Sequence, residues 1–285
     1  MFKTETTQVV ASAAEIQAAV LAAKCAGESV GFVPTMGALH EGHLSLVDAS
    51  LAECDRTVVS IFVNPTQFAP GEDMEKYPRP LAQDLRLLEE HGAWRAFVPT
   101  VSEMYPPGFD SYVEIGSVAA PLEGAARPTH FRGVATVVLK LFQMVPADRA
   151  YFGRKDYQQT LVVRQLIEDF NLPIDLRICP TVREPDGLAM SSRNAYLNPI
   201  ERQRAASIWQ SILLAERMHL AGERAVAPIR DAMRAQLAAT GVEAEYIAFL
   251  ADGTVREVST IAAPTVVTLA ARVGRTRLID NHTIG

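Results

Sequence analysis

The sequence is poor in cysteine and aromatic residues and has no long apolar run. Its 285 residues include 3 Cys, and Phe, Trp and Tyr together make up 7%. Cys25, Cys54 and Cys179 are widely spaced and form no C-x-x-C pair, which favours free thiols over a disulfide framework and offers no recognisable zinc site. No stretch reaches about 18 consecutive apolar residues, so we do not expect a membrane-spanning helix.

Basic residues are also scarce relative to acidic ones. The chain has 27 Lys and Arg against 33 Asp and Glu, a formal net charge of −6. General nucleic-acid binders usually carry a basic surplus, so this balance disfavours nucleic acid as a partner. The first 20 residues carry Lys3, Glu5 and Glu15 and lack the apolar core of a signal peptide. We therefore expect a cytoplasmic protein, in which a local basic pocket can still bind a small anion.

Short apolar runs alternate with helical patterns through the first two thirds of the chain. The expected strands are residues 29–34, 57–63, 94–98, 149–152 and 174–179, and the expected helices are residues 44–53, 80–91, 133–144 and 157–170. Strands that alternate with helices of this length predict βαβ units. The expected fold class is therefore α/β, a Rossmann-like, doubly wound parallel sheet with helices on both faces.

The pattern changes after residue 182. A polar, turn-rich segment is followed by two Ala-rich helical segments and then by three strand-like runs. The helical segments are residues 200–221 and 227–239, and the strand-like runs are residues 243–250, 265–272 and 276–280. This order predicts a second, smaller α+β domain at the C-terminus. We expect two domains, residues 1–182 and residues 183–285.

Polar clusters follow four of the predicted strands. They are residues 34–43, 64–68, 153–159 and 190–194. In an open parallel sheet, ligands bind beyond the carboxyl ends of the strands. Four clusters that would meet in one crevice are the main indication of an active site.

His40 and His43 lie three residues apart at the predicted start of a helix, so both rings can point to one side. A helix N-terminus with two imidazoles suits a polyphosphate whose charge rises during bond breaking. Two surface histidines at the start of a helix are the alternative. A zinc site from His40, Glu41 and His43 is disfavoured, because the spacing differs from that of metalloproteases and no third ligand is evident. The usual phosphate-binding loops, G-x-x-x-x-G-K-[ST] and G-x-G-x-x-G, are absent.

The other clusters each allow two interpretations. The amides of Asn64 and Gln67 suit a hydroxyl and a carboxylate, but Asn-Pro is also a turn signal. Lys155 suits phosphate and Asp156 suits a ribose, although both also fit a solvated helix start. Ser191, Ser192 and Arg193 together offer two hydroxyls and a guanidinium, which suit the β- and γ-phosphates of a nucleotide. Ion pairing or a surface loop explains a further polar group equally well: Arg127, His130 and Arg132.

Six motifs occur in the order PTMGALHEGH, FVNPTQF, YPR, THFRGV, FGRKDYQQ and MSSRN. With the sequence TRLIDN at residues 276–281, they cover nearly the full chain. The set resembles the pantoate–β-alanine ligase (pantothenate synthetase) family of the nucleotidyltransferase superfamily, whose signatures are H-x-G-H and K-M-S-K-S-like. Each motif alone is weak, but six in order are specific.

The resemblance implies an ATP-dependent condensation of (R)-pantoate with β-alanine to pantothenate, in the pathway to coenzyme A. The reaction would proceed through a pantoyl adenylate and release AMP and pyrophosphate. ATP is then a substrate, and Mg²⁺ is expected because it bridges ATP phosphates. For Asp84, an acid on a helix surface is the favoured interpretation, with an outer ligand of Mg²⁺ as the alternative. The resemblance also implies a cytoplasmic homodimer whose C-terminal domain acts as a lid.

The resemblance also assigns roles to individual residues. His43 matches the proton donor, and His40, Lys155 and Arg193 match groups that bind phosphates. Gln67 matches a residue that contacts both pantoate and β-alanine, and pantoate contacts are also implied for Gln159 and Asn64. The complete set implied for ATP is Met36, Gly37, Ala38, Leu39, His40, Glu41, Gly42, His43, Gly153, Arg154, Lys155, Asp156, Val182, Met190, Ser191, Ser192 and Arg193.

Three other functions are weighed against this one. Another small-molecule nucleotidyltransferase shares the signatures, but the amides of Gln67 and Gln159 favour a substrate with one carboxylate and a hydroxyl. A class I aminoacyl-tRNA synthetase is disfavoured by the acidic charge balance. A catalytically inactive nucleotide-binding regulator is disfavoured by the presence of both histidines, Lys155 and Arg193.

Overall fold

The computed structural model describes residues 6–69 and 71–285, and the chain forms two compact units. The first unit includes the chain up to Gly153 and the segment Gln158–Cys179. The second unit includes Arg154–Tyr157 and Pro180–Gly285. Four residues in the middle of the chain therefore group with the C-terminal part. Lys3 and Glu5, two charged residues that disfavour a signal peptide, lie outside the described residues.

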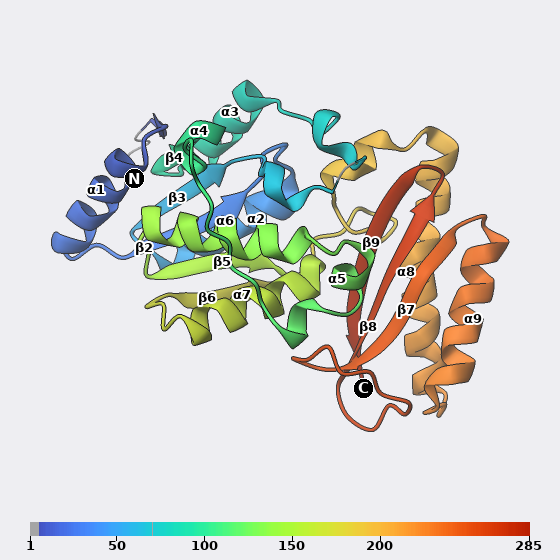
Figure 1. Ribbon diagram of the computed structural model, residues 1–285. Helices are drawn as coiled ribbons and strands as arrows, with labels where there is room; N and C mark the ends of the chain where they lie inside the picture. The colour runs from blue at the N-terminus through green and yellow to red at the C-terminus, as the bar shows by residue number, and fades with distance from the viewer. Residues whose placement is uncertain (1–5, 70) are drawn as a thin grey trace. The chain divides into compact units, whose positions relative to one another are not determined.

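The first unit contains a sheet of six parallel strands in the order β1-β4-β3-β2-β5-β6 (Figure 1). The strands are β1 (Gln8–Val10), β2 (Val30–Thr35), β3 (Arg56–Ile61), β4 (Arg95–Phe97), β5 (Arg149–Gly153) and β6 (Asp175–Cys179). The chain passes from β2 through β3 to β4 on one side and from β5 to β6 on the other. The order therefore reverses between β2 and β5, where doubly wound sheets bind ligands. The expectation of a doubly wound parallel sheet is confirmed.

Alternate residues along the strands divide the apolar side chains of this unit between two cores. Phe32 and Val58 face one core, and their neighbours Val33 and Val59 face the other. The first core includes side chains of α1 (Ala13–Cys25), α6 (His130–Met144) and α7 (Tyr157–Asp169). The second core includes side chains of α2 (Glu41–Glu53) and α3 (Leu81–His91). Strands buried on both faces explain the nearly continuous apolar runs in the sequence.

Strand β1 and helix α1 were not expected from the sequence. Strand β1 has only 3 residues, which is too short for an alternating pattern to be recognised. Helix α1 is rich in alanine, so its buried stripe of Ile16, Val20 and Ala23 is hard to distinguish from its exposed face. The side chain of Ser12 accepts from the backbone N–H of Glu15 and so caps the helix start.

The second unit packs two helices against a three-stranded antiparallel sheet in the order β7-β8-β9. Its elements are α8 (Pro199–Leu220), α9 (Val226–Ala239), β7 (Glu243–Ala251), β8 (Thr265–Val273) and β9 (Thr276–Ile284) (Figure 1). Ile212 of α8, Met233 of α9 and Phe249 of β7 belong to one buried cluster. The expected α+β architecture is confirmed. Strand β9 extends to Ile284 rather than to Asp280, because the polar pair Asp280 and Asn281 is buried inside the strand.

Short helical turns connect these elements. They are η1 (Pro65–Gln67), η2 (Asp73–Glu75), α4 (Val101–Met104), η3 (Ser117–Ala119), α5 (Glu123–Ala126), η4 (Arg154–Asp156) and η5 (Ser192–Tyr196). Three of them, η1, η4 and η5, hold residues that the sequence analysis singled out.

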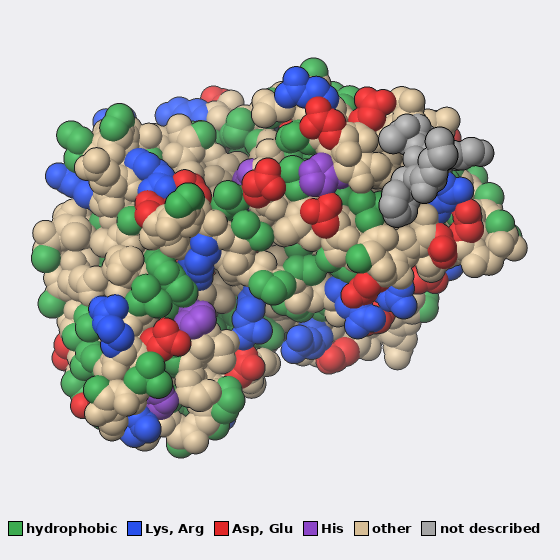
Figure 2. Space-filling model, turned by 180° about the vertical axis from the view of Figure 1, so that it is seen from behind, with side chains coloured by type: hydrophobic (Ala, Val, Ile, Leu, Met, Phe, Trp, Pro, Cys, Tyr) green, Lys and Arg blue, Asp and Glu red, His purple; other side chains and the backbone are tan. Residues whose placement is uncertain are grey.

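The surface is mixed in charge. Figure 2 shows basic and acidic side chains interspersed over one face of each part of the chain. This pattern fits the small formal charge of −6. Among the described residues, no helix combines the length and the apolar character needed to cross a membrane.

Candidate active site

The loop after β2 takes a backbone path that requires glycine. Gly37 and Ala38 have φ values of +81° and +51°, both in the left-handed region. A Cβ atom on Gly37 would also lie 2.9 Å from Ile61 Cγ2 and 3.0 Å from Asp84 Oδ2. The loop therefore brings its backbone against β3 and α3 before α2 begins.

Asp84 of α3 holds this loop in place. Its side chain is 1% exposed, and its two oxygens accept from the backbone N–H of Ala38 at 2.9 Å and of Leu39 at 2.8 Å. The N–H of Gly37 donates to Thr35 Oγ1 at 3.1 Å. Burial raises the pKa of Asp84, against the opposing effect of the two N–H donors. Asp84 is therefore not the acid on a helix surface that the sequence favoured.

His40 and His43 lie on one side of the start of α2, as their spacing predicted. Their ring centroids are 4.1 Å apart, with 37° between the planes. His40 is the N-cap residue, and its Nδ1 accepts from the N–H of Gly42 at 3.1 Å. Because Nδ1 accepts, the neutral ring of His40 carries its proton on Nε2.

Asn64, which follows β3, is buried and fully hydrogen-bonded. Its Oδ1 accepts from the Tyr105 hydroxyl at 2.7 Å and from Thr66 Oγ1 and N–H at 3.0 and 3.3 Å. Its Nδ2 donates to Gln67 Oε1 at 3.3 Å and to the Gly133 carbonyl at 3.1 Å. With 1% of Asn64 exposed, these contacts use both polar atoms of its amide.

Gln67 connects two of the sequence motifs. Its Nε2 donates to Met36 Sδ at 2.7 Å, so the residue after β2 meets the turn after β3. Its backbone carbonyl accepts from His130 Nδ1 at 3.0 Å and from Arg127 Nη2 at 3.3 Å. Arg127 also pairs with both oxygens of Glu72, at 2.7 and 2.6 Å. The structure therefore brings the Met36 and Gln67 side chains together and holds the Gln67 backbone from α6.

Contacts explain the polar group of Arg127, His130 and Arg132, which lies at the start of α6 because this helix begins at His130, earlier than expected. Burial and the neighbouring Arg127 lower the pKa of His130 to about 4, so its imidazole is neutral near pH 7. Arg132 pairs with Glu114 at 3.4 Å on the surface. Ion pairing, one of the interpretations left open, accounts for Arg127 and Arg132.

The two glutamines at the start of α7 have different environments. Gln158 is buried, and its amide bonds to the carbonyls of Val118 and Pro121 and to the N–H of Glu123. Gln159 is half-buried. Gln158 thus anchors the segment before α6.

In the second unit, strand β9 holds the turn that carries Lys155. Asn281 Nδ2 donates to the carbonyls of Arg154 at 3.0 Å and Lys155 at 2.8 Å. The Arg154 guanidinium donates to Asp252 at 3.0 Å and to Thr283 at 2.6 Å. The first two residues of the η4 turn are therefore held within the second unit, and Lys155 Nζ lies 3.7 Å from Asp156 Oδ1.

The segments implied for ATP at residues 182 and 190–193 also meet in this unit. The N–H of Met190 donates to the Val182 carbonyl at 3.0 Å, next to an antiparallel bridge between Arg183 and Ala189. Ser191 caps η5, and its Oγ accepts from the N–H of Arg193 at 3.3 Å. Since η4 and η5 both contact β9, the same strand supports the Lys155 and Arg193 segments.

A buried ion pair joins Arg183, the residue after Val182, to Asp280, the residue before Asn281. Asp280 is 1% exposed and accepts two bonds from the Arg183 guanidinium, at 2.7 and 3.0 Å. Burial raises the pKa of Asp280, and the guanidinium opposes this rise. Arg183 also stacks over Trp209, with its Cζ 3.6 Å from the ring centroid. Gly187, with a φ of +92°, closes the turn against Trp209, where a Cβ would lie 1.9 Å from Cδ1.

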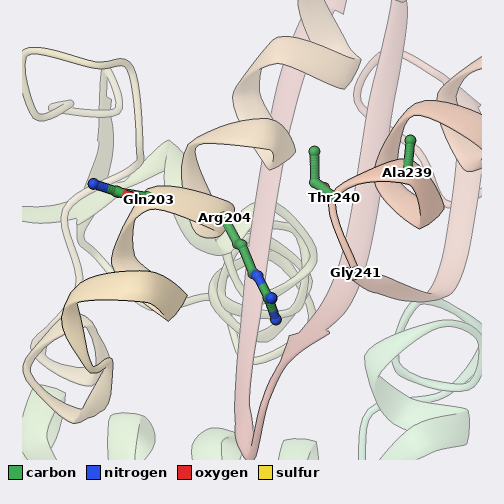
Figure 3. A pocket seen from close by; sticks show the side chains of 5 residues that line it. All are labelled: Gln203, Arg204, Ala239, Thr240 and Gly241. Carbon is green, nitrogen blue, oxygen red and sulfur yellow. The ribbon is translucent and has the colours of Figure 1, made fainter.

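The second unit also contains a pocket of about 460 Å³ beside α8 and the end of α9 (Figure 3). It is lined by Gln203, Arg204, Ala239, Thr240 and Gly241. None of these residues belongs to a motif that the sequence analysis singled out.

No metal centre is formed by side chains of the described ranges. Residues 6–69 and 71–285 contain no group of three or more His, Cys, Asp or Glu that could hold a metal ion. Asp84, the one residue considered for Mg²⁺, already accepts a backbone N–H at each oxygen.

Sequence reasoning missed three residues that support the site. Tyr105 and Arg183 lie outside every quoted motif, and Asn281 was quoted only as the end of TRLIDN, without a role. Each of the three forms a hydrogen bond with a residue far away in the sequence. Asp84 was singled out, but for a different role. A buried polar residue that holds a loop leaves no spacing pattern, so only the fold reveals it.

Comparison with known proteins identifies the family. The family model described as pantoate-β-alanine ligase matches residues 8–283. The pantothenate synthetase of Roseiflexus castenholzii is 52% identical over 275 residues, which cover 96% of this chain and 98% of the relative. The pantothenate synthetase of Thermotoga neapolitana is 51% identical over 90% of this chain and 92% of its own.

Solved structures agree. A pantothenate synthetase from Thermus thermophilus superposes with a TM-score of 0.92 at 44% identity, covering 97% of this chain and 99% of the other. A Francisella tularensis pantoate-β-alanine ligase, complexed with β-γ ATP and β-alanine, gives a TM-score of 0.84 at 34% identity and covers 97% of each chain. The chain therefore belongs to the pantoate–β-alanine ligase (pantothenate synthetase) family and is an ATP-dependent ligase that joins pantoate to β-alanine.

Proposed function

We propose that the ligation proceeds in two steps through an enzyme-bound pantoyl adenylate. In the first step the carboxylate of pantoate attacks the α-phosphorus of ATP, and pyrophosphate leaves. In the second step the amine of β-alanine attacks the acyl carbon, and AMP leaves as the amide bond forms. A free carboxylate is a poor acyl donor, and adenylation supplies the leaving group. No covalent protein nucleophile is needed, so the enzyme acts by positioning and by stabilising charge.

The proposal for the pantoate site depends on the contact between Gln67 and Met36. This hydrogen bond joins the motif implied for ATP to the motif implied for pantoate. We assign Gln67 to both pantoate and β-alanine, and Gln159 to pantoate. Asn64 acts in this site through Gln67, because its own amide is buried and fully used within the protein.

We assign residues in each unit to ATP. In the first unit, His43 donates a proton and His40 donates from Nε2 to the phosphates. In the second unit, Lys155 and Arg193 neutralise phosphate charge, with hydroxyl support from Ser191 and Ser192. The other residues implied for ATP are retained in the proposal: Met36, Gly37, Ala38, Leu39, Glu41, Gly42, Gly153, Arg154, Asp156, Val182 and Met190. The Francisella relative, which binds a form of ATP and β-alanine, supports these two ligands.

The backbone geometry limits how the loop after β2 can serve ATP. The N–H groups of Gly37, Ala38 and Leu39 already donate to Thr35 and Asp84. Contacts from this loop to ATP are therefore expected to use side chains, carbonyls or the N–H groups nearer α2. The rigid loop serves chiefly to place the two histidines.

Mg²⁺ fits this scheme as part of the nucleotide. We propose that it arrives bound to ATP phosphates, a role in which the ion keeps several waters and needs few protein ligands. Asp84 is then a structural residue of the loop. We further propose that residues 1–182 bind the nucleotide and pantoate, that residues 183–285 act as a lid which excludes water from the adenylate, and that the enzyme works as a cytoplasmic homodimer.

Pyrophosphate exchange tests the adenylate directly. Labelled pyrophosphate should enter ATP only when pantoate is present, and β-alanine should not be required. Exchange that proceeds equally without pantoate would remove the proposed mechanism. A Gln67→Ala variant supplies the site control, since it should weaken pantoate binding far more than ATP binding.

A further inference from the structure

Tyr105 lies outside every motif but bonds directly to the pantoate-site network. It follows α4, and its ring packs edge-on against Phe109, with centroids 5.0 Å apart, and near Phe62, at 6.2 Å. Its hydroxyl donates to Asn64 Oδ1 at 2.7 Å, the shortest of the three bonds that this oxygen accepts. Burial raises the pKa of Tyr105, so the hydroxyl keeps its proton and remains a donor at neutral pH.

The groups of Tyr105 and Thr66 that contact Asn64 determine which way its amide faces. The backbone N–H of Thr66 can only donate, so the amide atom that it meets must be the oxygen, and the Tyr105 hydroxyl and Thr66 Oγ1 donate to the same atom. The amide nitrogen of Asn64 then faces the Gln67 side chain and donates to its Oε1. A flipped Asn64 amide would set its NH₂ group against the Thr66 N–H and its oxygen against the Gly133 carbonyl, which would leave buried polar groups unpaired.

Asn64 in turn determines which way the Gln67 amide faces. Because Oε1 of Gln67 accepts from Asn64, its nitrogen is directed to the other side, where it donates to Met36 Sδ. The terminal torsion of a glutamine is otherwise broad and nearly two-fold, so its two orientations differ little in energy without such partners. A thioether is a weak acceptor, and a substrate oxygen would replace it favourably.

We propose that Tyr105 is a positioning residue for pantoate: through Asn64 it holds the Gln67 amide with its N–H donors directed to an oxygen of the substrate. The inference rests on the proposed role of Gln67 in pantoate binding. The opposite orientation of the amide would present an oxygen to the carboxylate or hydroxyl of pantoate and repel the carboxylate. Tyr105 thus acts through Asn64 and Gln67 and does not touch the substrate.

A Tyr105→Phe variant tests this relay, the hydrogen bonds that run from Tyr105 through Asn64 to Gln67. The variant keeps the ring and removes only the hydroxyl. Asn64 Oδ1 retains both bonds from Thr66, so the fold should survive. We expect kcat/KM for pantoate to fall about 10-fold, the size of one hydrogen bond, mainly through KM. The KM for ATP should stay within about 2-fold, which also shows that the variant is folded. Tyr112→Phe, at a ring that packs on Phe109 from the exposed side, is the matched control and should change neither value.

The decisive readout is the coupling between the two residues. If Tyr105 acts through Gln67, the loss caused by Tyr105→Phe should shrink to less than about 2-fold in a Gln67→Ala background. Calorimetric titration of pantoate into each variant should show the same pattern without turnover. Thr66→Val removes another donor to Asn64 and provides a second variant with the same expected direction.

Two results would overturn the inference in distinguishable ways. Normal pantoate affinity in Tyr105→Phe, or an equal loss with and without Gln67, would remove the relay while leaving the pantoate site intact. Normal pantoate affinity in Gln67→Ala would remove the proposed role of Gln67 and the relay with it. Pantoate-dependent pyrophosphate exchange by the wild-type enzyme is scored separately, so a failure of the reaction itself would be recognised.

Discussion

Two buried aspartates, one in each unit, hold segments proposed to bind ATP, and they do so in different ways. Asp84 accepts two backbone N–H bonds from the loop that leads to His40. Asp280 accepts two bonds from the Arg183 guanidinium and, through Oδ1, one from the N–H of Asn281. Both side chains are 1% exposed. The first aspartate organises a loop directly, and the second neutralises the Arg183 guanidinium.

Because of this difference, loss of either aspartate should leave different groups without a partner. Removing Asp84 leaves two backbone donors without their acceptor, a local defect at the start of α2. Removing the charge of Asp280 leaves a guanidinium of 17% exposure without an anion, which affects the whole second unit. Loss of Asp84 should therefore disturb the loop as well as lower the stability, whereas loss of the Asp280 charge should mainly lower the stability.

The largest effect is expected for Asp280→Asn. Its free energy of unfolding should fall by about 3 kcal/mol, because breaking a buried ion pair leaves an uncompensated charge. Urea denaturation measures this value. Glu257→Gln, in an exposed pair with Arg230, is the control and should cost less than about 0.5 kcal/mol. Equal losses for the two variants would show that the Arg183 pair contributes no more than a surface pair.

His43→Ala, and likewise His40→Ala, should lower the rate of adenylation by roughly 10²-fold with little change in stability, by analogy with lost oxyanion donors. Pyrophosphate exchange at saturating ATP and pantoate measures the rate. His91→Ala, in a surface pair with Asp48 of the same unit, is the control and should leave the rate unchanged. Near-normal exchange in both variants would contradict the assigned roles.

Asp84→Ala should lower the free energy of unfolding by about 2 kcal/mol, because two buried donors lose their acceptor. The rate should fall by about 10-fold, since the histidines lose the support of a fixed loop. Thermal unfolding and pyrophosphate exchange on one preparation give both values. Asp48→Ala on the exposed side of α2 is the control. A stability loss without any rate loss would show that the loop need not be rigid for catalysis.

Asn281→Ala provides the corresponding test in the second unit. It removes the donor to the Arg154 and Lys155 carbonyls, so KM for ATP should rise about 5-fold and stability should fall by about 1 kcal/mol. Pantoate affinity should not change. His282→Ala, at the next residue of β9, should leave KM for ATP within about 2-fold. A rise in KM for pantoate instead of ATP would contradict the proposed role of the η4 turn in binding ATP.

The smallest effect concerns pH. Because burial raises the pKa of Asp84 above its ordinary value near 3.8, the folded state binds this proton more tightly than the unfolded state. The contribution of Asp84 is therefore fully present below that value and is lost as pH rises through the raised pKa. The free energy of unfolding of the wild type, minus that of Asp84→Asn, should decrease from pH 4 to pH 7. An increase over this range would show that the N–H donors outweigh burial.

The fold was largely predictable from local patterns. Apolar runs such as Val58 and Val59 are buried on both faces of a parallel sheet, and helices of regular length separate the strands. Polar clusters at the strand ends pointed to the site. The spacing of His40 and His43 predicted correctly that their rings lie together.

The supporting contacts were not predictable in the same way. Asp84 lies 46 residues from Ala38, Tyr105 lies 41 from Asn64, and Asn281 lies 126 from Lys155. A hydrogen bond depends on where two chain segments meet in space, and no periodicity in the sequence encodes that meeting. An aspartate on an amphipathic helix therefore reads as a surface acid until the packing of α3 is known.

The sequence by itself determined the class of fold, the order of the motifs and the family they resemble, because these follow from local periodicity and from residue types in a linear order. The tertiary structure decided which polar residues hold that chemistry in place. Asn64 is buried with both polar atoms of its amide hydrogen-bonded within the protein, and Asp84 holds the loop after β2 through two backbone N–H groups. These contacts depend on which distant segments the fold brings together, so no local pattern in the sequence encodes them.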